Sequence, residues 1–211
     1  MHPDWLSNAY VLADEEDGAA AFVDSGAPLE PLLDAVARWR VEAQFVLRTH
    51  SHHDHVEHEH ELGVPVRTHS VELGRVRVEA VPTPGHSDDM VAFLVEDVVF
   101  SGDTLFKDSV GGGDLDAVRR AVMDFYMQLP HDTRVLPGHT DETTIGREWE
   151  QNPFVRYWRG LEEGSDPCRV AGAEATLVVW SPDYDGKGKA LVRFADGREA
   201  IVGGSRVQRT A

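Results

Sequence analysis

The chain has 211 residues, of which 41% are hydrophobic and 27% charged, so it can form one substantial domain and a small additional unit. Its formal net charge of −17 excludes nucleic acid as the expected partner, because phosphate backbones are bound by clustered Lys and Arg. No apolar run approaches the roughly 18 residues that a membrane span requires. Cys168 is the only cysteine, which excludes an intrachain disulfide and thiolate metal clusters.

The amino terminus does not resemble a secretory signal, because Met1 to Trp5 lacks a basic segment followed by an apolar stretch. We therefore expect a cytoplasmic protein. A metal ion in such a chain would be bound by imidazole and carboxylate groups. The expected partner is a small-molecule substrate, with neither nucleic acid nor a membrane involved.

The first elements in chain order are a hairpin, a helix and a strand. Residues 9–13 and 19–24 flank a polar turn and predict a hairpin. Apolar side chains recur at helical spacing from Pro28 to Arg40 and predict a helix. Ala43 to Arg48 is a short apolar strand that leads directly into a cluster of histidines.

Later segments continue the alternation of strands and helices. Further strands are predicted over residues 64–68, 75–81, 91–95, 98–101 and 134–136, and a helix over 114–129. This alternation across the first 160 residues indicates a layered α/β domain. After a predicted linker at 161–167, strands are predicted over 175–180, 190–194 and 199–202, and Asp196-Gly197 is typical of a two-residue hairpin turn.

The histidine cluster is the segment Thr49-His50-Ser51-His52-His53-Asp54-His55. In an extended segment His50 and His52 point to the same side, so both can bind one ion. Asp54 and His55, beyond the bend, can present ligands to a second ion. Imidazole with carboxylate suits Zn, Fe or Mn. A His-rich surface loop is the alternative interpretation of this segment alone, and the remaining histidines of the region are interpreted as spacer or solvated side chains: His53, His58 and His60.

Three later segments each place a metal-type side chain in a tight turn after a strand. They are Thr83-Pro84-Gly85-His86-Ser87, Ser101-Gly102-Asp103-Thr104-Leu105 and Leu136-Pro137-Gly138-His139-Thr140. Glycine before each candidate ligand permits the backbone angles and close approach that a ligand loop needs. One such loop would be an ordinary turn, but all of them in the order His-x-His-x-Asp-His, His, Asp, His predict a metal centre.

These motifs resemble those of the metallo-β-lactamase superfamily, and within it the glyoxalase II-like branch. The resemblance covers roughly residues 8 to 154 and includes Phe22-Val23-Asp24-Ser25-Gly26 and Asn152-Pro153-Phe154. It implies an α/β fold, the αβ/βα sandwich, with the metals at one edge. We expect residues 1–160 to form this catalytic domain and residues 167–211 to form a small β-barrel or meander, with an SH3-like barrel as one candidate.

The resemblance also implies a ligand set. One divalent ion would bind His50, His52 and His86, a second would bind Asp54, His55 and His139, and Asp103 would bridge both. Asp24 supports the metal loops in this family. Zinc is the expected metal, with iron or manganese as alternatives.

The implied activity is hydrolysis of a thioester of the hydroxyacyl-thiol type by a metal-bound hydroxide. Asp54, which can orient the water or relay its proton, and the bridging Asp103 are the expected catalytic residues. Gly112 stands where glyoxalase II proteins usually place an arginine, and the β-rich segment replaces the helical domain that contacts glutathione in larger members. Lys107 and Arg147 are candidates for binding substrate anions.

Other functions stay open. A persulfide dioxygenase would need one Fe(II) on His50, His86 and Asp103, and the complete second site favours hydrolysis over it. A lactonase would use the same hydrolytic chemistry, whereas a β-lactamase is disfavoured because no export signal is present. In the non-enzymatic alternative the metal domain is a scaffold, and the C-terminal segment mediates interaction or homodimerisation. Trp180 and Tyr184 are the aromatic residues expected near the contact that this segment makes.

Overall fold

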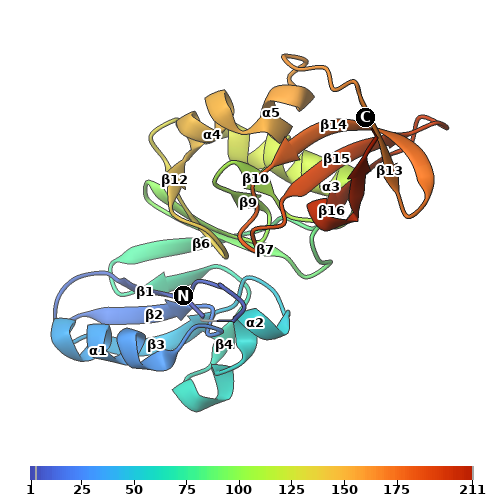
Figure 1. Cartoon of the computed structure of the whole chain (residues 1–211). Coiled ribbons are helices and arrows are strands. Elements are labelled where there is room, and N and C mark those ends of the chain that lie inside the picture. The colour runs from blue at the N-terminus through green and yellow to red at the C-terminus, as the bar shows by residue number, and fades with distance from the viewer. Residues whose placement is uncertain (3, 211) are drawn as a thin grey trace.

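The computed structural model describes residues 1–2 and 4–210 (Figure 1). The first sheet contains β1 (Tyr10–Ala13), β2 (Ala19–Val23), β3 (Glu42–Leu47) and β4 (Val66–Arg67). The second contains β5 (Val71–Leu73), β6 (Val76–Pro82), β7 (Val91–Val95), β8 (Val98–Gly102), β11 (Arg134–Pro137) and β12 (Thr143–Thr144). A ribbon of β9 (Leu105–Phe106) and β10 (Ser109–Val110) follows β8, and the helices are α1 (Leu29–Trp39), α2 (His53–Val56), α3 (Leu115–Arg120), α4 (Ile145–Gln151) and α5 (Pro153–Trp158). No helix of the described residues is long and apolar enough to cross a membrane.

The first sheet has the order β1-β2-β3-β4, and its outer face is covered by α1. β1 and β2 form the predicted antiparallel hairpin, with Tyr10 opposite Val23. β3 and β4 then run parallel to their neighbours. Leu32 of α1 packs with Phe22 and Val46 of the sheet, as the apolar spacing of the helix predicts.

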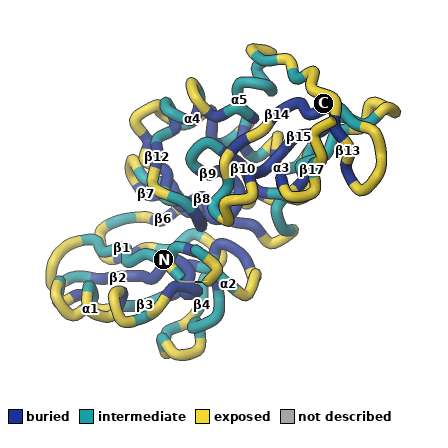
Figure 2. The backbone as a smooth tube through the Cα atoms, viewed as in Figure 1, coloured by how far each residue is buried: buried dark blue, intermediate teal, exposed yellow. Residues whose placement is uncertain are grey.

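The second sheet has the order β12-β11-β8-β7-β6-β5 and packs on both of its faces. Leu47 of the first sheet meets Phe93 and Phe100 in a core between the two sheets. On the other face, Val99 and Val135 lie in one core with residues of α3 and α5. The layers therefore follow the order helix, sheet, sheet, helices, which is the predicted αβ/βα sandwich (Figures 1 and 2).

Several elements differ from the sequence-based expectation. The helix predicted over 114–129 is regular only in α3 and continues as the π-helical turn η2 (Ala121–Phe125) and the 3-10 turn η3 (Tyr126–Gln128). These irregular turns bury Val122 and Tyr126 completely in the core. β5 was not predicted, because three residues are too few to show a strand period.

The C-terminal residues form a third, antiparallel sheet with the order β16-β15-β14-β13-β17. Its strands are β13 (Asp166–Val170), β14 (Ala173–Ser181), β15 (Lys189–Phe194), β16 (Glu199–Gly203) and β17 (Val207–Arg209), and the short turn η4 (Gly204–Arg206) precedes β17. The strands predicted within β14, β15 and β16 are confirmed. β13 begins at Asp166, inside the predicted linker. Its buried residues, Cys168 and Val170, alternate with exposed neighbours, as in a strand that is buried on one face.

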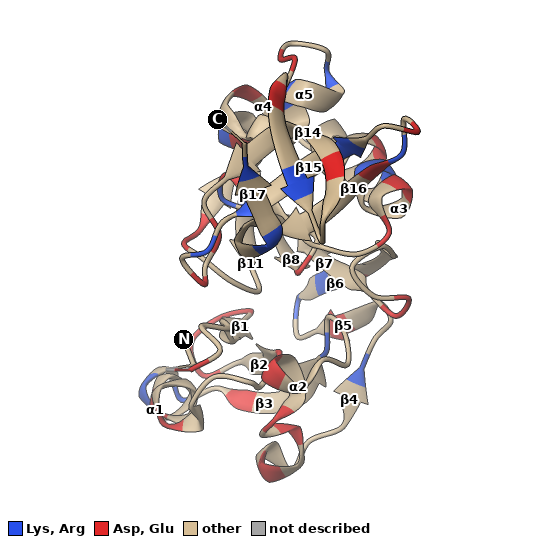
Figure 3. Cartoon of the chain, turned by 45° about the vertical axis from the view of Figure 1, so that its right-hand side comes forward, with Lys and Arg blue, Asp and Glu red and all other residues tan. Residues whose placement is uncertain are grey.

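The C-terminal sheet packs against the sandwich. Val178, Val179 and Leu191 lie in the same core as the α3 and α5 residues. Figure 3 marks the positions of basic residues in blue on β15 and β17 of this sheet. The division of the chain at residue 160 and the SH3-like topology stay predictions.

Candidate metal centre

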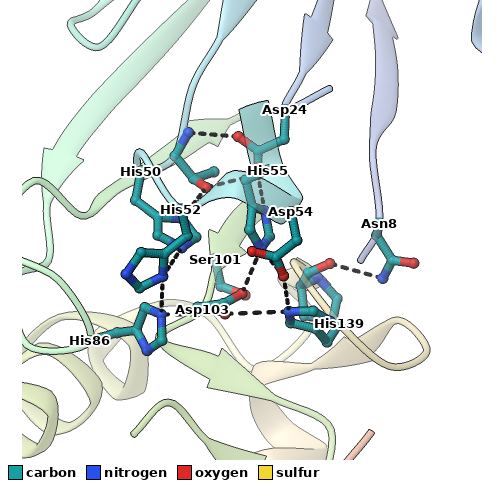
Figure 4. A network of polar contacts seen from close by, with 12 residues as sticks. Asn8, Asp24, His50, His52, Asp54, His55, His86, Ser101, Asp103 and His139 are labelled. Carbon is teal, nitrogen blue, oxygen red and sulfur yellow. Dashed lines mark hydrogen bonds and ion pairs between the residues drawn. The ribbon is translucent and has the colours of Figure 1, made fainter. Parts of the chain in front are cut away.

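All the predicted ligand loops leave strands at one edge of the sandwich. They follow β3, β6, β8 and β11, and the structure brings together the seven residues predicted from the sequence: His50, His52, Asp54, His55, His86, Asp103 and His139 (Figure 4). Two glycines permit this close approach. A Cβ on Gly138 would lie 2.3 Å from Asp103 Oδ1, and one on Gly26 would lie 1.5 Å from the Asp54 carbonyl oxygen.

Three histidines form the first triad of ligand atoms. His52 Nδ1 lies 3.1 Å from His50 Nε2 and 2.9 Å from His86 Nε2. His50 is buried, His86 is half-buried and His52 is exposed. The three nitrogens therefore surround one point at the solvent side of the centre.

The second triad lies deeper and consists of Asp54, His55 and His139. Asp54 Oδ2 lies 3.4 Å from His139 Nε2 and 3.7 Å from His55 Nε2. Asp103 lies between the triads, since its carboxylate oxygens are 3.3 Å from His55 Nε2, 3.4 Å from His139 Nε2 and 3.5 Å from His86 Nε2. The arrangement is the one expected of a carboxylate that bridges two ions.

Acceptors outside the centre orient three of the imidazoles. The Nδ1 atoms of His55, His86 and His139 lie 2.8 Å from Asp24 Oδ2, 2.9 Å from the Gly112 carbonyl oxygen and 3.1 Å from the Leu6 carbonyl oxygen. If each Nδ1 carries the proton and donates it to that acceptor, each Nε2 keeps a lone pair that faces the centre.

Asp24 organises the first ligand loop as well. Its Oδ1 accepts a hydrogen bond from the Thr49 backbone N–H, and its Oδ2 accepts one from the Thr49 hydroxyl, each at 2.8 Å. Thr49 Oγ1 in turn lies 3.0 Å from His50 Nδ1. One buried carboxylate therefore fixes both His50 and His55, which is the supporting role that the resemblance implies.

The two triads differ in their electrostatics. Burial lowers the pKa of His50 to about 4 and also lowers that of His86, so both imidazoles are neutral at pH 7. Burial opposes the charged form of His139 too, but contacts with Asp103 and Asp54 outweigh it and raise its pKa to about 9. Burial of Asp103 favours its neutral form, but the imidazoles of His55 and His139 outweigh this effect and hold the pKa of Asp103 well below its usual range.

Three buried atoms of the centre have no hydrogen-bond partner among the described residues. They are His55 Nε2, Asp103 Oδ1 and His139 Nε2, and they face one another. Polar atoms that are buried without partners are costly, so such a cluster points to a missing ligand. The donor set of imidazoles and carboxylates fits divalent zinc, iron or manganese.

The other histidines and the two candidate anion-binding residues lie elsewhere. His53 and His60 are exposed, and His58 pairs with Glu61 at 2.8 Å. Lys107 pairs with Asp141 at 3.0 Å, and Arg147 pairs with Asp108 and the buried Glu148. Both positive charges are therefore already neutralised within the chain.

The sequence did not reveal several contributors to the centre. The carbonyl groups of Leu6 and Gly112 orient ligands through the backbone, which leaves no mark on residue type. Tyr184, from the loop between β14 and β15, stacks on the His139 imidazole with ring centroids 3.7 Å apart and planes 6° apart. Burial, together with the charge of Asp103, raises the pKa of the Tyr184 phenol, which therefore stays protonated at neutral pH.

Comparison with known proteins agrees with this geometry. Residues 62–139 match the metallo-beta-lactamase superfamily. An uncharacterised protein of Aquifex aeolicus is 33% identical over 194 residues, which cover 70% of this chain and 91% of that protein. The chain belongs to the metallo-β-lactamase superfamily and is a metallo-hydrolase of that family.

Two other similarities bear on function. A probable hydroxyacylglutathione hydrolase, glo2 of Schizosaccharomyces pombe, is 29% identical over 160 residues, which cover 62% of each chain. The crystal structure of the BLEG-1 B3 metallo-beta-lactamase matches with a TM-score of 0.66 and 28% identity, and the match covers 73% of this chain and 96% of that one. About a quarter of this chain therefore has no counterpart in the BLEG-1 structure.

Proposed function

We propose that this protein hydrolyses thioesters of the hydroxyacyl-thiol type with two divalent metal ions, zinc as the expected metal. The main observation that supports this proposal is the pair of triads joined by Asp103, in which the predicted ligand atoms face a common centre. We assign His50, His52 and His86 to one ion, Asp54, His55 and His139 to the other, and Asp103 to both. The similarity to a probable hydroxyacylglutathione hydrolase supports the choice of substrate class.

Two such ions, when bound, supply a nucleophilic hydroxide at neutral pH and polarise a carbonyl group. The chain's own residues prepare this chemistry by position. Asp24, Gly112 and Leu6 fix the rings of His55, His86 and His139, so the ligand atoms do not have to reorganise. Asp54 is only half-buried and lies at the rim of the second triad, where its carboxylate can accept a proton from water and pass it to the leaving thiolate.

The ion pairs of Lys107 and Arg147 bear on which thiol carrier the substrate can have. Lys107 and Arg147 are both held in ion pairs, and Gly112 offers a carbonyl group where glyoxalase II proteins usually carry an arginine. A strongly anionic thiol carrier such as glutathione would find few free positive charges here. We therefore propose a smaller or less acidic thiol carrier.

The experiment is a metal analysis followed by a substrate panel. The purified protein should contain close to two transition-metal ions per chain, and the metal-replete protein should release free thiol from a 2-hydroxyacyl thioester. The same preparation is tested with a lactone, a β-lactam and a persulfide. Asp116→Ala is the matched control, because it removes an exposed carboxylate of α3 that lies outside both triads.

Each alternative has its own outcome in this panel. One bound iron with oxygen consumption on the persulfide would replace the proposal with a dioxygenase that uses His50, His86 and Asp103. Ring opening of the lactone alone would keep the hydrolytic centre and change the substrate class. Two bound ions with no turnover of any of these substrates would favour the scaffold interpretation.

A further inference from the structure

The loop between β14 and β15, residues 182–188, is fixed against the metal centre. Lys189 Nζ pairs with Asp183 Oδ2 at 3.1 Å, and both side chains are nearly buried. The ammonium group also lies 5.1 Å from the centre of the Phe106 ring. At the start of the loop, the Ser181 hydroxyl donates to the hydroxyl of Ser109 at 3.0 Å, and both residues are completely buried.

These anchors position Tyr184. The backbone N–H of Tyr184 donates to Asp183 Oδ1 at 3.0 Å. Since Lys189 fixes the Asp183 carboxylate, this hydrogen bond also fixes the backbone of Tyr184. The phenol ring lies flat on His139 and 6.2 Å from the Phe106 ring. The stack on His139 and the edge contact with Phe106 hold the ring in one orientation beside the second triad.

The hydroxyl of Tyr184 is not used by the fold. It has no hydrogen-bond partner among the described residues, and the side chain is only half-buried. The ring is stacked on His139 with centroids 3.7 Å apart, which places the phenol beside the second triad of the metal centre. A fixed donor with no partner, on a half-buried side chain beside a reaction centre, is suited to bind a polar group of the substrate.

We propose that Tyr184 is a substrate-contacting residue that selects the acyl group by a hydrogen bond to its 2-hydroxyl, and that Asp183 and Lys189 are its positioning residues. This rests on the thioester hydrolase proposed above. In a 2-hydroxyacyl group the hydroxyl oxygen is two bonds from the carbonyl carbon, so a carbonyl group held at the centre would bring this hydroxyl beside the second triad, where Tyr184 stacks on His139. The C-terminal sheet, through this loop, thereby supplies part of the acyl subsite.

The test compares ligands that differ by one hydroxyl group. Lactate and propanoate are titrated calorimetrically into the metal-loaded wild type, Tyr184→Phe, Tyr184→Ala and the control Tyr157→Phe. The Tyr157 hydroxyl bonds to Glu199, which is outside the centre. Metal content and melting temperature are recorded for each variant. For the same variants, kcat/KM is measured with 2-hydroxypropanoyl and propanoyl thioesters of one thiol.

The wild type should prefer lactate, and Tyr184→Phe should reduce that preference about fivefold to tenfold, the effect of one hydrogen bond. Metal content should stay unchanged, and Tyr157→Phe should keep the wild-type preference. A wild type without preference, or an unchanged preference in Tyr184→Phe and Tyr184→Ala, would overturn the inference. Metal loss from Tyr184→Ala with the preference retained would also overturn it, because Tyr184 would then only support His139.

The two proposals fail separately. If Tyr184→Phe changes the preference for lactate but no thioester is hydrolysed, the acyl subsite stands and the thioester hydrolase does not. If thioesters are hydrolysed and the preference does not depend on Tyr184, the hydrolase stands and the acyl subsite is wrong.

Discussion

The metal edge of the sandwich and the C-terminal loop meet at His139, but they are built in different ways. The ligands of the edge follow strands directly, each within a short motif that also carries the turn residues. Tyr184 reaches the same place through a separate sheet, held by the buried pair of Asp183 and Lys189. The candidate metal centre is thus assembled from local motifs, whereas the proposed acyl subsite depends on long-range packing.

The largest effect is expected from Asp103→Ala, which removes the group that joins the two triads. Metal content should fall from about two ions to about one or fewer, and activity should fall more than about a hundredfold, beyond the loss seen for outer residues at metal sites. Elemental analysis and thiol release measure both. Asp141→Ala, which removes an exposed carboxylate near His139, should change neither. Equal losses in the two variants would show that the ligands are misassigned.

Leu191→Ala separates packing from metal binding. Leu191 is fully buried in the core that the C-terminal sheet shares with α3 and α5, so its truncation should lower the free energy of unfolding by about 2–5 kcal/mol. The folded variant should keep its metals, because the ligands all lie in the sandwich. Urea unfolding measures the change, and the exposed Leu161→Ala is the control. A loss as small as that of the control would mean that this packing contributes little to stability.

Asp24→Asn tests the support beneath the metal edge. The amide keeps the size of the carboxylate but loses its charge and one acceptor, so the hydrogen bonds to Thr49 and His55 cannot all persist. Metal affinity should fall about tenfold to a hundredfold, as for other outer-sphere partners. Competition with a chelator measures the affinity. Asp34→Asn, on the exposed side of α1, should leave it unchanged. An unaltered affinity in Asp24→Asn would show that the loop is fixed by its backbone alone.

The alternation of strands and helices predicted a layered α/β domain, while the αβ/βα sandwich and the ligand set were implied by the resemblance to the metallo-β-lactamase superfamily. The seven residues could be singled out in the sequence for one reason. Strand periods and Pro-Gly or Gly-Asp turns are local, and a ligand after the end of each strand meets the others once the sheets form. His50 and His52 are one such case, and Gly138 with His139 is another, since only glycine permits the close approach to Asp103.

What the sequence did not predict depends on contacts that are distant in the chain or made by the backbone. The Leu6 and Gly112 carbonyl groups orient ligands whatever their side chains are. β13 has only two buried residues, and β17 is a three-residue edge strand with none, so neither is long enough to show a clear strand period. Tyr184 was expected at the contact of the C-terminal segment, but nothing local shows that its ring lies on His139.

The smallest effect is expected from His58→Ala, the variant that shows whether the boundary of the centre is drawn correctly. His58 belongs to the same histidine-rich region as the ligands, yet its side chain pairs with the half-exposed Glu61 rather than with either triad. Its backbone N–H donates to the Ser25 carbonyl oxygen at 3.1 Å, and alanine keeps that bond. Since partly exposed pairs contribute little, the free energy of unfolding should change by less than about 1 kcal/mol, and the metal content should stay at two. Elemental analysis and urea unfolding on one preparation measure both quantities, and loss of a metal ion from this variant would extend the centre beyond His55.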